Sequence, residues 1–182
     1  MPNETDLKES LKSTKVLAVA RKVPVLSMVF RRLTPHQQEI VSLLRRTAIF
    51  SELLESELVE LLHLLHERTF SAGEVIFTAG EPGLGLYVIF KGEVEIGHSE
   101  KNGKNRVARL GPGEVFGEVS FLDGSGRSAS AIALVRTELI GFYRTELMDL
   151  LERRPALASK ILFALARQLG MRMRAMLQLT SS

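Results

Sequence analysis

The distribution of glycine is the feature of this sequence that most restricts its fold. Of the 14 glycines, 12 lie between Gly73 and Gly126, and none precedes Gly73. The flanking segments are instead rich in leucine, glutamate, arginine and alanine, which are good helix formers. Because glycine is favoured at tight turns and disfavoured inside helices, the pattern predicts helices at both ends and a turn-rich β region between them.

Short segments of strand length fill the glycine-rich region. Several of them alternate apolar and polar residues, as half-buried antiparallel strands do. Strands are expected at residues 74–80, 86–92, 94–97, 106–111, 130–135 and 139–143. Asn102-Gly103, between two of these segments, is typical of a hairpin turn. Many short strands at regular spacing indicate a jelly roll or barrel, so the predicted fold class is α+β with an antiparallel β-roll (jelly roll) at its centre.

Helical patterns flank the β region on both sides. Residues 5–46 are expected to form two or three helices, the last beginning at Thr34-Pro35, and the leucines from Leu54 to Leu65 predict another helix. After the strands, Thr145 is expected to cap a short helix, and Pro155 to begin a long one. Glycine at position 170 weakens the middle of the long helix, and its apolar stripe consists of Leu157, Ile161, Leu165, Leu169 and Met173.

The composition excludes several classes of protein. The chain has no cysteine, which rules out disulfides, thiol catalysis and zinc–thiolate sites. No apolar run approaches the roughly 18 residues of a membrane span, and the polar N-terminus lacks the order of a signal peptide. We therefore expect a cytoplasmic protein. The net charge of +3 is uneven, since residues 1–46 hold nine lysines or arginines and four aspartates or glutamates.

Enzyme and metal motifs are incomplete in this sequence. GHSEKNGKN (97–105) has the wrong glycine spacing for a phosphate loop, and GPGEVFG (111–117) has the wrong spacing for a dinucleotide fingerprint. His63 and His66, predicted on one face of a helix, lack a third metal ligand and are interpreted as a surface pair. Since no nucleophile–base pair is evident either, we expect neither an enzyme nor a metal-binding protein.

The stretch FGEVSFLDGSGRSAS, residues 116–130, carries an acid and an arginine nine residues apart. Glu118 and Arg127 either form an ion pair across a turn or hold two parts of one ligand. A short helix beginning at Phe116-Gly117-Glu118 would direct backbone N–H groups toward an anion, and its glycine would let a ligand approach the backbone. A carboxylate suits a sugar hydroxyl and a guanidinium suits a phosphate. With amides near Ser128-Ala129 completing the shell, the arrangement predicts nucleotide binding without bond cleavage.

These motifs resemble those of the cyclic nucleotide-binding domain family. That family includes bacterial catabolite activator-type regulators, the regulatory subunits of cyclic-AMP-dependent kinase and cyclic-nucleotide-gated channels. The resemblance runs from about Thr47 to Leu169 and matches in order, spacing and glycine placement. It rests on TAIFSELLESELVELL (47–62), FSAGEVIFTAGEPGLGLYVIFKGEVEI (70–96) and LGPGEVFGEVSFLDGSGRSASAIAL (110–134).

The resemblance assigns roles to individual residues. It implies that Glu118 binds the ribose 2′-hydroxyl and that Arg127 binds the cyclic phosphate. The ligand-binding residues that it implies are Phe116, Gly117, Glu118, Val119, Arg127, Ser128 and Ala129. Gly126 stands where proline is common in the family, which affects the rigidity of the loop and removes no ligand contact.

A domain organisation and a function follow from the same resemblance. Residues 1–46 are expected to form a basic N-terminal helical extension, residues 47–154 the cyclic nucleotide-binding β-roll domain, and residues 155–182 a C-terminal lid or dimerisation helix. The implied function is a non-catalytic sensor that binds cyclic AMP, favoured over cyclic GMP, and signals to an unidentified protein partner by helix movement. No DNA partner is expected, because the family's transcription factors carry a helix-turn-helix after the C-terminal helix and this chain stops at Ser182.

Two alternatives stay open. Residues 15–33 are both basic and apolar, a composition that suits a membrane surface or a protein-interaction scaffold. Packing of this segment against the domain, or against a second copy of the chain, is the simpler expectation. The other alternative is that the chain is a fragment of a larger effector, channel or regulator.

Overall fold

The computed structural model describes residues 33–100 and 103–180, and most of these belong to one compact unit, Gln37–Ser182. The helices predicted before residue 33, and nearly all of the basic segment 15–33, lie outside the described residues. Within the described part of the chain, no helix combines the length and the apolar character that a membrane span requires.

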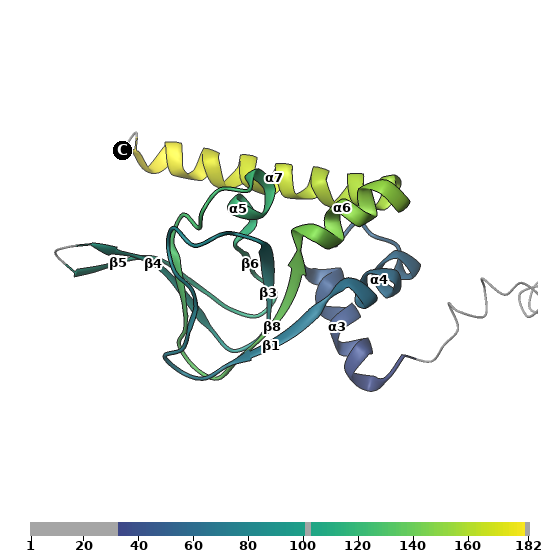
Figure 1. Ribbon diagram of the computed structural model, residues 1–182, viewed down its shortest axis with the longest axis horizontal. Coiled ribbons are helices and arrows are strands. Elements are labelled where there is room, and N and C mark those ends of the chain that lie inside the picture. Colours follow the sequence, from purple (N-terminus) through teal and green to yellow (C-terminus); the bar gives the residue numbers. More distant parts are fainter. Residues whose placement is uncertain (1–32, 101–102, 181–182) are drawn as a thin grey trace, which may run out of the picture. The chain divides into compact units, whose positions relative to one another are not determined.

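Two four-stranded sheets form the centre of this unit (Figure 1). The first has the strand order β1-β8-β3-β6, with the bounds His66–Phe70, Thr137–Tyr143, Gly85–Lys91 and Val115–Phe116. The second has the order β2-β7-β4-β5, with the bounds Val75–Phe77, Ser130–Ala133, Val94–Glu100 and Gly103–Leu110. All of these neighbouring strands pair antiparallel. The predicted α+β class and the jelly-roll architecture are therefore confirmed.

Side chains from both sheets meet in one apolar cluster, because alternate residues of a strand point to the same face. The buried members of this cluster are Phe70, Ile89, Val94, Phe116, Ala131, Ala133 and Leu139. Phe77 of β2 and Tyr87 of β3 are partly buried and pack against it. Their rings stack with centroids 6.2 Å apart, and the ring of Tyr87 stacks on that of Phe116 at 5.5 Å. Three aromatic rings, those of Phe77, Tyr87 and Phe116, therefore form one group within this cluster.

The helices precede, interrupt and follow the strands. Their bounds are Pro35–Arg46 for α3, Glu55–Leu61 for α4, Glu118–Asp123 for α5, Arg144–Arg153 for α6 and Pro155–Thr180 for α7. The predicted starts at Pro35 and Pro155 and the predicted short helix after Gly117 are confirmed. α7 packs against α6, where Leu157, Ile161 and Leu165 are buried, and then runs past α5 (Figure 1). The end of the predicted apolar stripe, at Met173, is exposed.

The helix predicted through Leu65 is the clearest error. After α4 a single 3-10 turn, Leu62–Leu64, leads into β1, which begins at His66. His63 and His66 therefore share no helical face, and Nε2 of His66 lies 3.1 Å from Oε1 of Glu146 on α6. β1 pairs with β8 along its whole length. These long-range hydrogen bonds outweigh the local leucine periodicity, because propensity is only a weak prior against tertiary context.

Two smaller predictions had different outcomes: the cap at Thr145 is wrong, and the turn at Asn102-Gly103 lies partly outside the described residues. α6 begins at Arg144, so Thr145 lies inside the first turn and does not cap the helix; its hydroxyl donates to Oε2 of Glu146 at 2.7 Å. Asn102 of the predicted hairpin turn is outside the described residues, and the strands that it joins pair with Glu100 opposite Gly103.

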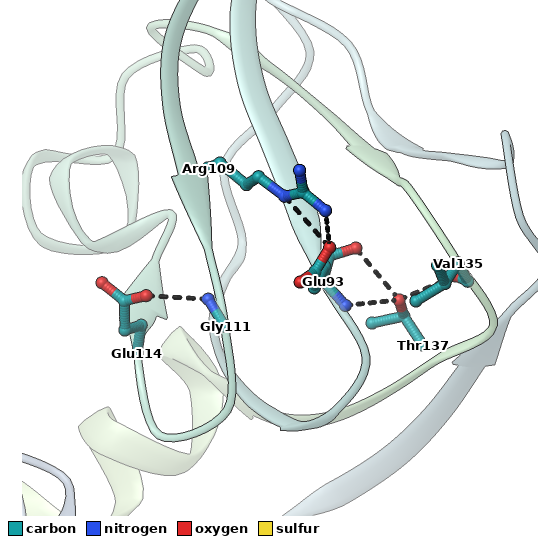
Figure 2. Close-up of polar contacts among 6 residues, drawn as sticks. All are labelled: Glu93, Arg109, Gly111, Glu114, Val135 and Thr137. Atoms are coloured by element: carbon teal, nitrogen blue, oxygen red, sulfur yellow. Dashed lines mark hydrogen bonds and ion pairs between the residues drawn. The ribbon is translucent and has the colours of Figure 1, made fainter.

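A fully buried threonine connects the turns at one end of the sheets (Figure 2). The hydroxyl of Thr137 has two acceptors for its single proton, the carbonyls of Val135 at 2.9 Å and Glu93 at 3.1 Å, and it accepts from the Glu93 amide at 3.3 Å. Arg109 pairs with the carboxylate of Glu93 in the same group. A Cβ at Gly92, where φ is +95°, would lie 2.5 Å from this hydroxyl. The hydroxyl thus fixes the turn between β3 and β4 against the turn before β8.

Replacing Thr137 by valine should lower the free energy of unfolding by about 1–3 kcal/mol, because it removes the hydroxyl that accepts from the amide of Glu93 and leaves a buried methyl group facing backbone polar groups. Urea unfolding of the two proteins measures this difference. Thr69→Val is the matched control, since Thr69 is an exposed strand threonine, and it should change stability by less than about 0.5 kcal/mol. Equal effects of the two substitutions would contradict the role given to the hydroxyl.

Candidate functional site

Arg127 is buried, with 6% of its surface exposed, where the chain leaves α5 and enters β7. Two backbone hydrogen bonds fix its main chain: its amide donates to the carbonyl of Glu81, and its carbonyl accepts from the amide of Gly80, both at 2.8 Å. Its guanidinium reaches back to α5, where Nη1 donates to the carbonyl of Gly117 at 2.9 Å and to the hydroxyl of Ser120 at 3.1 Å. The arginine is therefore held at both ends.

The guanidinium of Arg127 lies against aromatic rings and neutral oxygens. Its Cζ is 4.1 Å from the ring centroid of Phe77 and 5.8 Å from that of Tyr87, which are cation–π distances. Among the described residues, no group accepts a hydrogen bond from the buried Nε, and the carboxylate of Glu118 pairs with another cation. Burial lowers the pKa of Arg127, and nearby Tyr87 and Glu118 oppose the shift. Since arginine stays protonated in proteins, the site holds a buried positive charge with an unused donor.

Glu118, the first residue of α5, is the buried acid of the site, with 3% of its surface exposed. Its partner comes from α7: Oε1 accepts a hydrogen bond from Nη1 of Arg172, whose Nη2 donates to the carbonyl of Val115 at 2.8 Å. The sequence allowed two interpretations of Glu118 and Arg127. The first, an ion pair between them across a turn, is not formed in the structure. α7 passes α5 in Figure 1, which is where this contact joins them.

Two glycines allow the close approaches that the site needs. Gly117 has a left-handed backbone, with φ at +80°, and a Cβ there would lie 2.5 Å from Nη1 of Arg127. Glycine alone meets both requirements without strain. A Cβ at Gly126 would lie 2.9 Å from the carbonyl oxygen of Gly80. The loop before Arg127 therefore packs closely on the loop that contains Gly80. Glycine at position 126, where the resemblance leads one to expect proline, permits this contact.

α5 is also attached at its C-terminal end. Nη1 of Arg144, the first residue of α6, donates to the carbonyls of Phe121 at 3.0 Å and Leu122 at 2.9 Å. These bonds satisfy carbonyls that a helix end leaves without a partner inside the helix. The ring of Phe121 also packs on that of Phe142 of β8, with centroids 5.7 Å apart. The short helix is thus connected to the start of α6.

One pocket, with a cavity volume of about 100 Å³, brings these groups together. The predicted site residues that line it are Gly117, Glu118, Val119, Arg127, Ser128 and Ala129. Phe116 does not line it, because its side chain belongs to the core between the sheets. The charged residues of the lining are two arginines and one glutamate, so the pocket is net positive. Within the described residues, no group of three His, Cys, Asp or Glu side chains could hold a metal ion.

The sequence prediction missed four lining residues, Phe77, Ile96, Ser120 and Arg172. Ser120 follows Gly117 by three residues, so the helical spacing of α5 was a usable signal. Phe77 and Ile96 come from β2 and β4, and only the packing of the two sheets brings them to the pocket. Arg172 lies 54 residues after its partner Glu118, and nothing local to α7 indicates that contact.

Comparisons with a family model and with known proteins indicate the same family. A model described as the cyclic nucleotide-binding domain matches residues 67–154. The cyclic AMP receptor protein of Thermus thermophilus is 36% identical over 127 residues, which cover 69% of this chain and 59% of the receptor. A cyclic nucleotide-gated potassium channel of Mesorhizobium japonicum is 31% identical over 110 residues, covering 60% of this chain and 29% of the channel. This chain therefore spans less than two thirds of either relative.

A solved structure has the same fold as this chain. The N-terminal domain of a transcriptional regulator from Streptomyces coelicolor A3(2) superposes with a TM-score of 0.67 at 34% sequence identity. The superposition covers 74% of this chain and 94% of that domain. The similarity thus extends over nearly the whole of that N-terminal domain.

Replacing Gly117 by alanine should destabilise the protein more than replacing Gly113. Both glycines have a positive φ, so alanine costs about 1–2 kcal/mol of backbone strain at either position. A Cβ at Gly113 meets nothing within 4 Å, whereas at Gly117 it displaces the guanidinium of Arg127. We expect a further loss of about 1 kcal/mol or more from the hydrogen bonds of that guanidinium. Urea unfolding of the two variants measures the difference, and equal losses would contradict it.

Proposed function

Since this chain belongs to the cyclic nucleotide-binding domain family, we propose that it is a non-catalytic sensor that binds a cyclic nucleotide and signals the binding to a protein partner. Cyclic AMP is the ligand that we favour over cyclic GMP, because the Thermus thermophilus relative is named as a cyclic AMP receptor. Residues 47–154 would form the binding domain, with residues 1–46 as an N-terminal extension and residues 155–182 as a lid or dimerisation helix.

The observation that carries the proposal is the buried guanidinium of Arg127. It is held from both sides by the loop at Gly80 and by α5, and its contacts are neutral oxygens and aromatic rings. A buried cation without a carboxylate costs free energy unless an anion or further acceptors complete its shell. A cyclic phosphate supplies one negative charge and oxygens that match the planar donors of arginine.

The remaining predicted residues would surround the rest of the ligand. In this proposal Glu118 accepts a hydrogen bond from the ribose 2′-hydroxyl, which the lining of one pocket by Glu118, Gly117, Val119, Ser128 and Ala129 supports. Phe116 would act indirectly, by supporting Tyr87 and Phe77 beneath the guanidinium of Arg127.

The proposed signal passes from the pocket into the helices. α5 begins at Glu118 and ends where Arg144 of α6 binds its last carbonyls. α6 in turn packs on α7. A ligand that shifts or rigidifies α5 would therefore act on α6 and α7, whose positions a protein partner or a second copy of the chain would detect. The exposed methionines of α7 suit such a contact.

Replacing Arg127 by glutamine should weaken cyclic nucleotide binding by about 2–5 kcal/mol, which is about 1.5 to 3.5 decades in affinity, because the phosphate would lose its buried cation. Isothermal titration calorimetry with cyclic AMP and cyclic GMP measures the loss. We expect the wild-type protein to bind cyclic AMP the more tightly.

Arg136→Gln is the matched control, since it removes the same charge from an exposed arginine in the turn after β7. Arg127→Lys retains the charge and tests whether the planar donors matter, and thermal unfolding establishes that each variant is folded. The proposal fails if the folded wild-type protein binds neither nucleotide, or if Arg127→Gln binds as tightly as the wild type.

A further inference from the structure

The outer face of α7 carries apolar side chains that are exposed to solvent. The inner face of this helix is buried at Leu157, Ile161 and Leu165. On the opposite side, five residues follow one another at alternating spacings of four and three, which is the spacing by which one α-helix packs along another. These residues, here termed the outer seam, are Ser159, Phe163, Ala166, Gly170 and Met173.

The outer seam alternates projecting and recessed positions. Phe163 is 68% exposed and Met173 is 65% exposed, so both large side chains project into solvent. Between them lie Ala166 and Gly170, and a Cβ at Gly170 would meet only Nη2 of Arg174, at 4.0 Å, outside the backbone of the helix itself. Exposed apolar residues that are aligned in this way mark interaction sites, whereas scattered ones do not. A helix with complementary side chains would fill the recess between the two projecting residues.

The charges that α7 itself places beside the outer seam are all positive. The helix contains no aspartate or glutamate, and Lys160, Arg167 and Arg174 recur every seven residues, so they form one row along the seam. Lys160 pairs with Glu57 at 2.7 Å and Arg167 pairs with Glu52 at 2.6 Å. Arg174 pairs with no carboxylate of the described residues, and its Nε donates to a backbone carbonyl of α7 at 3.3 Å. The row is therefore neutralised at one end and positive at the other.

A second copy of α7 fits this face poorly. In a parallel pair in register, Gly170 would lie opposite the same glycine and leave a gap where two side chains are missing. In an antiparallel pair, the row of cations would lie beside the same row of the other helix, and α7 has no acid to neutralise it. A different helix, with a large apolar residue opposite Gly170 and a carboxylate beside Arg174, avoids both problems.

We propose that the outer seam of α7 is the docking face for an α-helix of another protein, apolar along its contact stripe and acidic beside Arg174. The inference rests on the proposed function for one point, that this helix belongs to the partner that receives the signal. The docking itself does not require a nucleotide, because no residue of the outer seam lines the pocket.

Two synthetic peptides of three heptads test the docking face, through the fluorescence anisotropy of each labelled peptide during titration with the full chain. Both carry leucine along the contact stripe, and the flanking rows hold glutamate in one and lysine in the other, so that like charges prevent self-pairing. The glutamate peptide should bind about fivefold to tenfold more tightly at low salt. This difference should shrink at high salt, because salt screens exposed charges. Equal affinity of the two peptides at low salt, or no binding of either, would overturn the proposal.

Three variants place the peptide on the outer seam. Phe163→Ser should weaken binding of the glutamate peptide about tenfold or more, because it removes a projecting apolar anchor. Arg174→Gln should weaken it about twofold to fivefold, the effect of one exposed ion pair. Gly170→Leu fills the recess and should also weaken binding, although leucine favours a helix interior over glycine. Loss of binding in a variant with a more stable helix cannot be attributed to unfolding.

The matched controls remove similar side chains elsewhere. Met148→Ser changes a methionine of α6 that is 43% exposed, and Arg136→Gln changes an exposed arginine in the turn after β7. Both variants should bind the glutamate peptide as the wild type does. Wild-type affinity in the three variants of the seam would overturn the proposal, as would equal losses in the controls.

Sedimentation velocity of the full chain distinguishes a partner from a second copy. The wild type should sediment as a monomer at the concentrations at which the glutamate peptide binds. A dimer that Phe163→Ser dissociates would overturn the proposal, because the seam would then hold a second copy.

Peptide binding without nucleotide separates this inference from the proposed function. If the folded chain binds the glutamate peptide but neither cyclic AMP nor cyclic GMP in calorimetry, the proposed function fails and the docking face stands. If it binds a cyclic nucleotide but no peptide, with or without that nucleotide present, the docking face fails and the proposed function stands.

Discussion

The burial of one guanidinium, that of Arg127, is the constraint on which the rest of the site depends. A charge with 6% exposure whose hydrogen bonds go only to neutral oxygens is costly unless its surroundings are fixed around it. The main-chain bonds to Gly80 and Glu81, the left-handed Gly117 and the close approach of Gly126 to Gly80 all serve that purpose. Because these features hold the cation before any ligand arrives, the ordering cost of binding at this position is already met by the fold.

The ion pair between Glu118 and Arg172 determines how charge is distributed in the pocket. If the acid paired with Arg127, the buried charge would be neutralised locally and an anion would gain little there. Since it pairs with Arg172 instead, Arg127 keeps a buried charge that no carboxylate contacts by a hydrogen bond, and the charge balance of the pocket includes a residue of α7. The same contact therefore sets the charge of the pocket and connects it to a helix that begins 37 residues beyond Glu118, at Pro155.

Local patterns in the sequence were sufficient for most of the fold and for one part of the site. Turn glycines, alternating strands and the prolines at 35 and 155 define elements through their own residues, so they were predictable. Glu118 and Arg127 stand in one short segment and were found for the same reason. The strand at His66 was missed because its partner lies more than 70 residues away in β8, and the leucines before it imitate a continuing helix. Arg172 was missed on similar grounds, since an exposed arginine on an amphipathic helix carries no sign of a distant carboxylate.

The contacts of α5 join three helices to one another. α5 is attached to α7 through Glu118 and Arg172 and to α6 through Arg144, and α6 packs directly on α7. The six residues of α5 span only about 9 Å, so the short helix acts as a rigid link between the two attachments. A displacement of α5 must then strain or break one of them. The packing of α6 on α7 is apolar and buried, whereas the Arg172 contact joins a side chain that is 43% exposed to a carboxylate that is 4% exposed. Loss of this contact would leave a buried carboxylate without its cation, which costs free energy. The position of α5 therefore depends on both of the helices that follow the β-roll, through a buried carboxylate at its first residue and a guanidinium at its last turn.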